Sequence, residues 1–537
     1  MDRVTTTSAP APPNPRVLPP VLGRLVSGTF WLALRTPLQA IFVLWSTRLT
    51  LQVIGPNQWG AYNFAWGFGF LQFLLEFGIS SALQRQISER WTKGDRDGVD
   101  RSIACGMTFY AAMALVQAAV LLSLAYWPYV ANQFQGDSYR LIVKLLWLQA
   151  LTAPCYGLSM VVSSVLQAAR RYDFIPRYEV AIVILRFAIL WIGLNAGFDF
   201  FLVVVAQTLV SIGLAMGPAI WVMVRELGHV PHFRGARLSD YKTLLHISFY
   251  MFLIQLSVVL ADKIDTTMLG LALPHEPELG LSIYSVVSKP FSQIRQVGWM
   301  LASLVMPAVA SLAAAHDERG LERVKYDGPR LHIGLLLPVA LLAWIYASPF
   351  LTLWVGNDLG DEGARMAPWL MRLFLVATVP LLLAVHAQMA IGMNKIAVIA
   401  LAALAGSVFN LPISYYLTRQ LGVEGVIWGT VLTTVFSNFL IPGVYIFWVL
   451  DIRWKTYLTR TLAAPLAGAI SLIAVTWLCR FWFPIVLKGA TPLAQSPPLL
   501  IHLTIGSLAY LAGYLAVPKG REDLDLILRR FRNRAAS

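Results

Sequence analysis

The feature that most constrains this chain is a succession of about fourteen long apolar stretches, joined by short connections, between residues 28 and 517. Each stretch reaches the roughly 20 residues that a helix needs to cross a bilayer. Of the 537 residues, 57% are hydrophobic and 13% are charged, so a soluble fold could not cover its apolar surface. Unbroken apolar runs favour helices, because a membrane barrel shows short alternating segments. The sequence therefore predicts an all-α, polytopic membrane protein.

The predicted spans leave too little chain for a separate soluble domain, so function must reside within the helical bundle. We place them at residues 28–54, 60–82, 103–130, 141–168, 178–197, 200–224, 244–272, 279–314, 331–355, 366–390, 395–418, 424–450, 459–484 and 498–517.

Lys and Arg gather in every second connection, as at Arg319, Arg323, Lys325 and Arg330. The alternate loops, such as the one around His275, have few or none. Positive residues mark the cytoplasmic side of a membrane protein, which places both termini in the cytoplasm. The same rule explains the formal net charge of +14 without nucleic acid, because the charge is scattered over short loops.

A weak internal repeat relates the starts of the first and seventh predicted spans, Thr29–Trp31 and Ser248–Tyr250, and also those of the second and eighth. It predicts two six-helix units related by an axis along the membrane normal. The predicted organisation is a disordered cytoplasmic tail (1–24), an N-lobe (25–225), a cytoplasmic linker (226–243), a C-lobe (244–450), two further helices (451–517) and a basic cytoplasmic tail (518–537).

Signatures of catalysis are absent from the sequence. It contains no phosphate-binding loop with Lys-Ser or Lys-Thr, no His-Glu-x-x-His and no serine elbow. The three cysteines, Cys105, Cys155 and Cys479, lack metal-ligand spacing. We expect a protein that is not an enzyme and needs no metal or cofactor.

Positive charge inside the spans is the main functional signal, because each such residue costs roughly 2.5–3.5 kcal/mol at mid-helix. A net-positive interior would attract an anionic substrate, and the planar guanidinium binds phosphate through two hydrogen bonds. Near the interfaces, the alternative is that a long side chain extends its charge to the membrane surface. The candidate substrate-binding residues are Arg35, Arg48, Arg186, Lys289, Arg295 and Arg372.

Fewer acidic residues lie within the spans. Asp262 and Asp265 are three positions apart in the seventh span and share a helix face, with Lys263 between them, and Glu76 lies in the second span. These groups could form ion pairs, or could bind a proton or sodium ion during transport. Both interpretations stay open.

Two short motifs resemble a known family. Residues 53–62, Val-Ile-Gly-Pro-Asn-Gln-Trp-Gly-Ala-Tyr, and residues 77–85, Phe-Gly-Ile-Ser-Ser-Ala-Leu-Gln-Arg, resemble the opening helices of polysaccharide-biosynthesis flippases. These form the Wzx-like branch of the multidrug/oligosaccharidyl-lipid/polysaccharide exporter superfamily. Residues 262–265 with Met268-Leu269-Gly270 are similar to a stretch of the seventh helix in that group.

The resemblance implies two six-helix lobes around a central cavity that opens to one side at a time. It also implies movement of an undecaprenyl-diphosphate-linked oligosaccharide, such as an O-antigen or exopolysaccharide unit, from the inner to the outer leaflet of the bacterial cytoplasmic membrane. The implied partners are this lipid-linked substrate, membrane lipids and polysaccharide polymerase machinery. The two extra helices would provide a groove for the lipid tail.

Two other functions remain as alternatives. An ion-coupled multidrug exporter would share the superfamily fold, but organic cations would favour an acidic cavity. A membrane polysaccharide polymerase or ligase is disfavoured, because the predicted outer loops are short and carry no catalytic constellation.

Overall fold

The computed structural model describes residues 20–169, 171, 174–237, 240–242, 244, 252, 256, 264–273, 277–356, 358–393, 395–482 and 492–535. Helices dominate this part of the chain, and it contains no strand. The all-α prediction is therefore confirmed.

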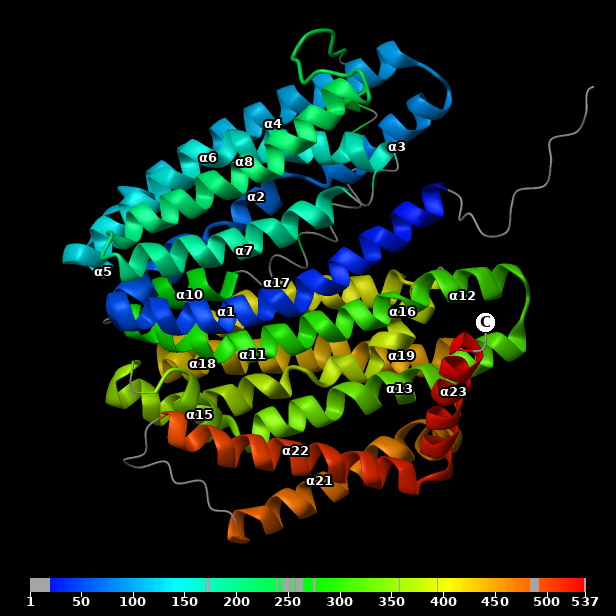
Figure 1. Cartoon of the computed structure of the whole chain (residues 1–537). Coiled ribbons are helices and arrows are strands. Elements are labelled where there is room, and N and C mark those ends of the chain that lie inside the picture. The colour runs from blue at the N-terminus through cyan, green and yellow to red at the C-terminus, as the bar shows by residue number, and fades with distance from the viewer. Residues whose placement is uncertain are drawn as a thin grey trace, which may run out of the picture.

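The N-terminal half forms eight helices that build one lobe (Figure 1). They are α1 (Pro20–Gly67), α2 (Phe70–Leu75), α3 (Ile79–Thr92), α4 (Arg96–Ala125), α5 (Pro128–Gln133), α6 (Gly136–Ala168), α7 (Phe174–Asn195) and α8 (Phe200–Arg225).

The second lobe begins, in the described part of the chain, at α10 and ends at α19. Its elements are α10 (Ile264–Ala272), α11 (Pro277–Ser303), α12 (Val305–Ala314), α13 (Glu318–Ile345), α14 (Ala347–Trp354), α15 (Gly360–Val376), η1 (Val379–Leu383), α16 (Ala384–Gly392), α17 (Ala397–Leu421), α18 (Val423–Thr434), η2 (Val435–Leu440) and α19 (Ile441–Val449). The chain continues through α20 (Trp454–Thr456), η3 (Tyr457–Leu462), α21 (Ala463–Trp482), α22 (Pro492–Ala516) and α23 (Pro518–Ala535).

Twelve helices in the described residues are long and apolar enough to cross a membrane. One of them, Leu34–Thr92, runs over the first two predicted spans. Most of the predicted seventh span, 244–272, lies outside the described residues. The multi-span architecture is confirmed, and the count of fourteen stays a prediction.

The two lobes contact each other near one end of the bundle. There, Trp59 Nε1 donates a hydrogen bond to Ser285 Oγ at 2.8 Å, and the Tyr129 hydroxyl donates to the Leu271 carbonyl at 2.6 Å. This is the end predicted to face outside. The ribbons of the lobes diverge toward the opposite end, which carries α3 and α12 (Figure 1).

Glycine allows the close approach of α1 to α11 at this contact. Gly60 lies so near the other lobe that a Cβ atom there would stand 1.9 Å from the Glu278 carbonyl oxygen. Gly55, at φ 75°, breaks the helical backbone of α1 just before Pro56. The turn motif that prompted the family resemblance therefore turns the chain between the first two predicted spans and brings the second against the C-lobe.

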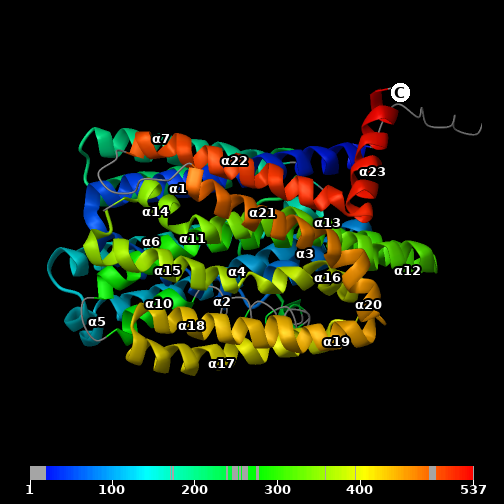
Figure 2. The same cartoon turned by 90° about the horizontal axis from the view of Figure 1, so that it is seen from below.

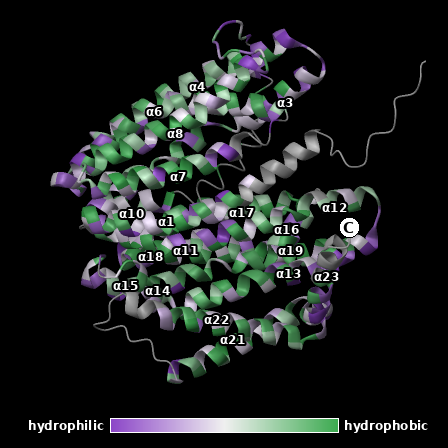
Figure 3. Ribbon diagram, viewed as in Figure 1, coloured by the Kyte–Doolittle hydropathy of each residue, from purple (hydrophilic) through white to green (hydrophobic). Residues whose placement is uncertain are grey.

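The C-terminal helix α23 runs across the direction of the spans (Figures 1 and 2). Asp523 fixes its first turns, because Arg330 of α13 donates to both carboxylate oxygens at 2.8 and 2.6 Å. The Tyr514 hydroxyl donates to the same carboxylate at 2.6 Å. Arg330 is only 2% exposed, so a residue that the sequence placed among loop charges is a buried anchor. Apolar residues cover most of the helices, and hydrophilic residues concentrate toward their ends (Figure 3).

Candidate functional site

Arg35 and Arg186 lie in one neighbourhood, between α1 and α7. Arg35 forms an ion pair with Glu179 at 2.9 Å, and each side chain remains about a third exposed. The Arg186 guanidinium carbon lies 5.7 Å from the centre of the Phe42 ring. Its buried Nε atom has no hydrogen-bond partner among the described residues. Gln207 of α8 donates to the Arg186 main-chain carbonyl at 2.8 Å, which ties α7 to α8.

Arg48 and Arg372 each contact the C-terminal end of another helix, on the predicted outer side. Arg48 donates to the Leu353 carbonyl near the end of α14 at 3.1 Å. Arg372 donates to the Trp344 carbonyl near the end of α13 at 3.2 Å and lies 5.9 Å from the Trp344 ring centre. A cation at the C-terminus of a helix is stabilised by the helix dipole. These contacts explain both residues structurally, and a role in substrate binding stays a prediction.

Lys289 and Arg295 both lie on α11. Both are half-buried, and the Arg295 guanidinium lies 5.2 Å from the centre of the Phe291 ring. Six positions separate the two cations, which is about 240° around an ideal helix. The described contacts of the predicted cations are therefore made at different places: between α1 and α7, at the ends of α13 and α14, and on α11.

In the C-lobe, Asp265 is 3% exposed and joins four helices. One carboxylate oxygen accepts a hydrogen bond from Asn410 Nδ2 of α17 at 3.2 Å. The other accepts from the Tyr284 hydroxyl of α11 at 3.0 Å and from Thr430 Oγ1 of α18 at 2.6 Å. Its predicted neighbours Asp262 and Lys263 lie outside the described residues.

A polar space of about 210 Å³, partly open to solvent, adjoins this network. Hydroxyl and amide groups of α17, α18 and η2 line it, with Asn410, Thr430 and Thr433 among them. Thr433 donates to the Asn410 side-chain oxygen at 3.1 Å. The element η2 is a π-helix, a form that occurs frequently at functional sites.

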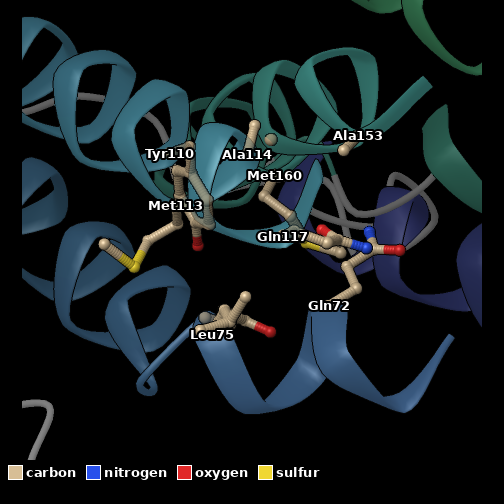
Figure 4. Close-up of a pocket in the computed structure, with 10 residues that line it drawn as sticks. Gln72, Leu75, Tyr110, Met113, Ala114, Gln117, Ala153 and Met160 are labelled. Carbon is tan, nitrogen blue, oxygen red and sulfur yellow. The ribbon is translucent and has the colours of Figure 1, made fainter. Parts of the chain in front are cut away.

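In the N-lobe, Glu76 is 6% exposed and lies at a break between α2 and α3. The next two residues, Phe77 (φ 50°) and Gly78 (φ 69°), have left-handed backbone conformations. The Ser80 hydroxyl donates to the Glu76 carboxylate. Glu76 also lines a cavity of about 330 Å³, partly open to solvent, together with residues of α2, α4 and α6 (Figure 4).

Sequence reasoning missed the partners of these charges. Glu179 falls inside the predicted fifth span but was not counted among the buried acids, although its place in an apolar run was a usable signal. Tyr284, Asn410 and Thr430 come from three different helices, and no local pattern links them to Asp265. The break after Glu76 had a signal in Gly78, because glycine tolerates a positive φ.

Comparison with protein families finds one match. The model described as "Polysaccharide biosynthesis protein" matches residues 25–312, which is more than half of the chain. No curated protein matches.

Solved structures share the fold at low sequence identity. One, described as "Lipid II flippase MurJ, inward closed conformation", has a TM-score of 0.65 and 13% identity, over 92% of this chain and 98% of that one. A second, an inward-facing multidrug resistance MATE family transporter of the MOP superfamily, has a TM-score of 0.62 and 14% identity, over 80% and 99%. A third, a MOP superfamily transporter from Pyrococcus furiosus, has a TM-score of 0.51 and 14% identity, over 81% and 97%.

Proposed function

This chain belongs to the polysaccharide biosynthesis protein family, and on that premise we propose that it is an alternating-access flippase. Its substrate is an undecaprenyl-diphosphate-linked oligosaccharide, such as an O-antigen or exopolysaccharide unit. The protein moves this substrate from the inner to the outer leaflet of the bacterial cytoplasmic membrane, with both of its own termini in the cytoplasm.

The observation that carries the proposal is the state of Arg186. Its Nε atom is buried without a hydrogen-bond partner among the described residues, and the guanidinium lies against Phe42 between α1 and α7. A buried donor without a partner costs about 1–3 kcal/mol, and more when it is charged. A diphosphate would recover this energy, because phosphate oxygens accept charge-assisted hydrogen bonds from arginine.

The Arg35–Glu179 pair offers a second contact for an anion beside Arg186. Both side chains of the pair are about a third exposed, so the ion pair is accessible and screened by solvent. An incoming phosphate could compete with Glu179 for the Arg35 guanidinium. Release of the phosphate would restore the ion pair, and the site would return to its starting state without a net change in partners.

Alternating access is supported by the arrangement of the lobes. They contact each other at the predicted outer end, through Trp59 with Ser285 and Tyr129 with Leu271, and diverge toward the predicted cytoplasmic end (Figure 1). We infer that this is an inward-facing state. In the opposite state these outer contacts would separate, and Lys289 and Arg295 of α11 would provide further positive charge along the path.

The prenyl tail need not cross the bundle, because it can remain in the bilayer while the sugar moves. The paired helices α21 and α22 lie at the edge of the C-lobe, opposite the N-lobe (Figure 1). Trp477 and Trp482 of α21 are 59% and 79% exposed, as expected for a surface that meets lipid. We propose that this pair guides the tail and that polymerase machinery receives the product.

We also propose that transport is coupled to a proton or sodium gradient, without a bound cofactor. Net movement of a substrate against its concentration gradient requires an energy source. Buried carboxylates in membrane proteins commonly mark ion pathways. Glu76 and Asp265 are buried acids of the described spans that lie beside cavities, and Glu76 is the one with a single donor, whereas Asp265 is compensated by donors from three helices.

The test is leaflet translocation of a labelled undecaprenyl-diphosphate oligosaccharide in proteoliposomes. Arg186→Gln should reduce the rate by about tenfold or more, since it removes charge-assisted hydrogen bonds to the diphosphate. The matched control is Arg140→Gln, because Arg140 is 77% exposed. Equal rates for Arg186→Gln and the intact chain would contradict the proposed site. Export of small amphiphiles without movement of lipid-linked sugar would favour the multidrug-exporter alternative.

A further inference from the structure

Glu76 is a buried carboxylate with few interactions that compensate for its loss of hydration. Its carboxylate accepts a hydrogen bond from the Ser80 hydroxyl, four positions along the same segment, and no ion pair to Glu76 occurs among the described residues. A buried charge is normally paired or bound to a cation, because the loss of hydration costs several kcal/mol. The residue therefore lacks a partner of the kind that its burial requires.

The cavity beside Glu76 is lined by neutral oxygen groups rather than by cations. Its ten lining residues contain no Lys, Arg or His, and Tyr110 is the one other titratable side chain among them. Gln72 of α2 and Gln117 of α4 place their amide groups toward the same space (Figure 4). The remaining described lining is apolar, so none of the lining side chains that the structure describes can balance the carboxylate.

Tyr110 supplies an independent indication of a missing ligand. The residue is 7% exposed, and its buried hydroxyl has no partner in hydrogen-bonding geometry within the described part of the chain. The ring is held in place because Gly157 of α6 packs against it, where a Cβ atom would stand 2.8 Å from Tyr110 Cβ. An unpartnered buried hydroxyl is costly, so Tyr110 adds one unsatisfied oxygen group beside a carboxylate that has a single donor.

The backbone is also unusual at this depth. Tyr110 lies at the middle of α4, so the cavity is near the centre of the membrane. Phe77 and Gly78 interrupt the helix there with positive φ values. Non-helical backbone at membrane depth is tolerated where it is buried in protein or lines a polar cavity, and broken helices form ion sites in transporters.

We propose that Glu76, with Gln72, Tyr110 and Gln117, forms a site for a small monovalent cation in the N-lobe. One carboxylate neutralises one positive charge, and oxygen groups suit a hard cation such as sodium or hydronium. The site is separate from the Asp265 network of the C-lobe. Its functional meaning rests on the proposed coupling to a cation gradient, but binding itself does not require the transported lipid.

The test uses the full chain in nanodiscs and measures the thermal unfolding midpoint, Tm. One arm replaces choline chloride with sodium chloride at constant pH and ionic strength, and the other lowers the pH without sodium. A cation that binds the folded state should raise Tm by about 2–4 °C in one arm. The first arm identifies sodium as the ligand, and the second identifies hydronium.

Glu76→Gln should abolish the cation-dependent rise in Tm. The matched control, Glu89→Gln, removes an exposed carboxylate of the following helix α3 and should keep the full rise. Tyr110→Phe should raise the half-saturating cation concentration by about 3- to 10-fold, which corresponds to the loss of one hydrogen bond. An unchanged rise in Glu76→Gln would overturn the proposal, as would the absence of any rise in the intact chain.

Two further points keep the test decisive. If Glu76→Gln does not fold, Glu76→Asp retains the charge but withdraws it from the cavity, and weaker cation binding is then the expected result. Because no lipid-linked sugar is present, failure here leaves the flippase proposal standing. If Tm responds to the cation as expected but no lipid-linked sugar is translocated, the proposed substrate would be contradicted and the cation site would be supported.

Discussion

Among the described membrane-spanning residues, Asp265 of the C-lobe and Glu76 of the N-lobe are buried carboxylates, and the two lobes surround them in opposite ways. In the C-lobe, Asp265 accepts hydrogen bonds from Tyr284, Asn410 and Thr430, which belong to three other helices. In the N-lobe, Glu76 accepts one from Ser80 of its own segment. Asp265 lies in the described helix α10, whereas Glu76 precedes two residues with positive φ. Burial alone therefore does not distinguish a carboxylate that stabilises the fold from one that binds a ligand.

The difference lies in where the hydrogen-bond donors come from. Donors on separate helices make the carboxylate of Asp265 a junction of α10, α11, α17 and α18, so its loss should loosen the lobe. A donor on the same segment holds nothing together, so the loss of Glu76 should change ligand binding more than stability. Stability measurements on matched variants can therefore test this comparison without any transport assay.

Asp523, another buried carboxylate, shows how large the effect on unfolding free energy should be when a carboxylate is fully paired. Arg330 donates to both of its oxygens, and Tyr514 donates to one of them. Asp523→Ala removes this partner from the 2%-exposed Arg330, which keeps an ion pair with Asp327 at 2.9 Å, so we expect a loss of about 3–4 kcal/mol in unfolding free energy. Thermal unfolding in detergent measures it, with Asp525→Ala in the same helix as the control. A loss below about 1 kcal/mol would remove this reference point.

Asp265→Ala should have the next largest effect, because it removes an acceptor from Tyr284 and Asn410 and one of the two acceptors of Thr430. We expect a loss of about 2–4 kcal/mol, from buried donors that cost about 1–3 kcal/mol each and relax in part. The same thermal unfolding series measures it. Asp265→Asn keeps the shape and some of the hydrogen bonds, and should lose less. If Asp265→Ala were as stable as the intact chain, the C-lobe carboxylate would not be a structural junction.

These variants also mark the limit of what the sequence could predict. Span positions followed from apolar length, and agreement is close for the helix Phe200–Arg225, which was predicted at 200–224. The buried charges were found because a charge in an apolar run is conspicuous. The partners of these charges could not be predicted. Pairs such as Arg35 with Glu179 depend on how the helices pack, and no local sequence pattern encodes that packing.

Helix ends outside the membrane were equally hard to predict. The helix α13 begins at Glu318, thirteen positions before the predicted span at 331, because helical structure continues beyond the apolar run. Arg330 therefore lies inside a helix rather than in a loop, and meets α23 there. No local signal marks this continuation, because polar residues extend a helix as readily as they form a connection.

Tyr284→Phe sharpens the comparison by removing one of the donors described for Asp265. The expected loss is about 1 kcal/mol, because the carboxylate keeps Asn410 and Thr430 as partners. Thermal unfolding resolves such a change, and Tyr139→Phe, which removes a hydroxyl bonded to the Ala125 carbonyl, provides a control for the substitution itself. A loss above about 3 kcal/mol would mean that Tyr284 carries the junction alone.

Glu76→Gln should produce the smallest effect on stability, and its sign is informative. In a buffer without sodium and at a pH that keeps the carboxylate ionised, the intact chain holds a buried charge with one donor. The amide is of similar shape, removes that charge and keeps an oxygen for Ser80. We therefore expect a change of less than about 1 kcal/mol, or a slight gain, since replacement of an uncompensated buried charge is often neutral or stabilising. A loss of about 3 kcal/mol would show that Glu76 is a structural junction like Asp265, and the contrast between the lobes would then disappear.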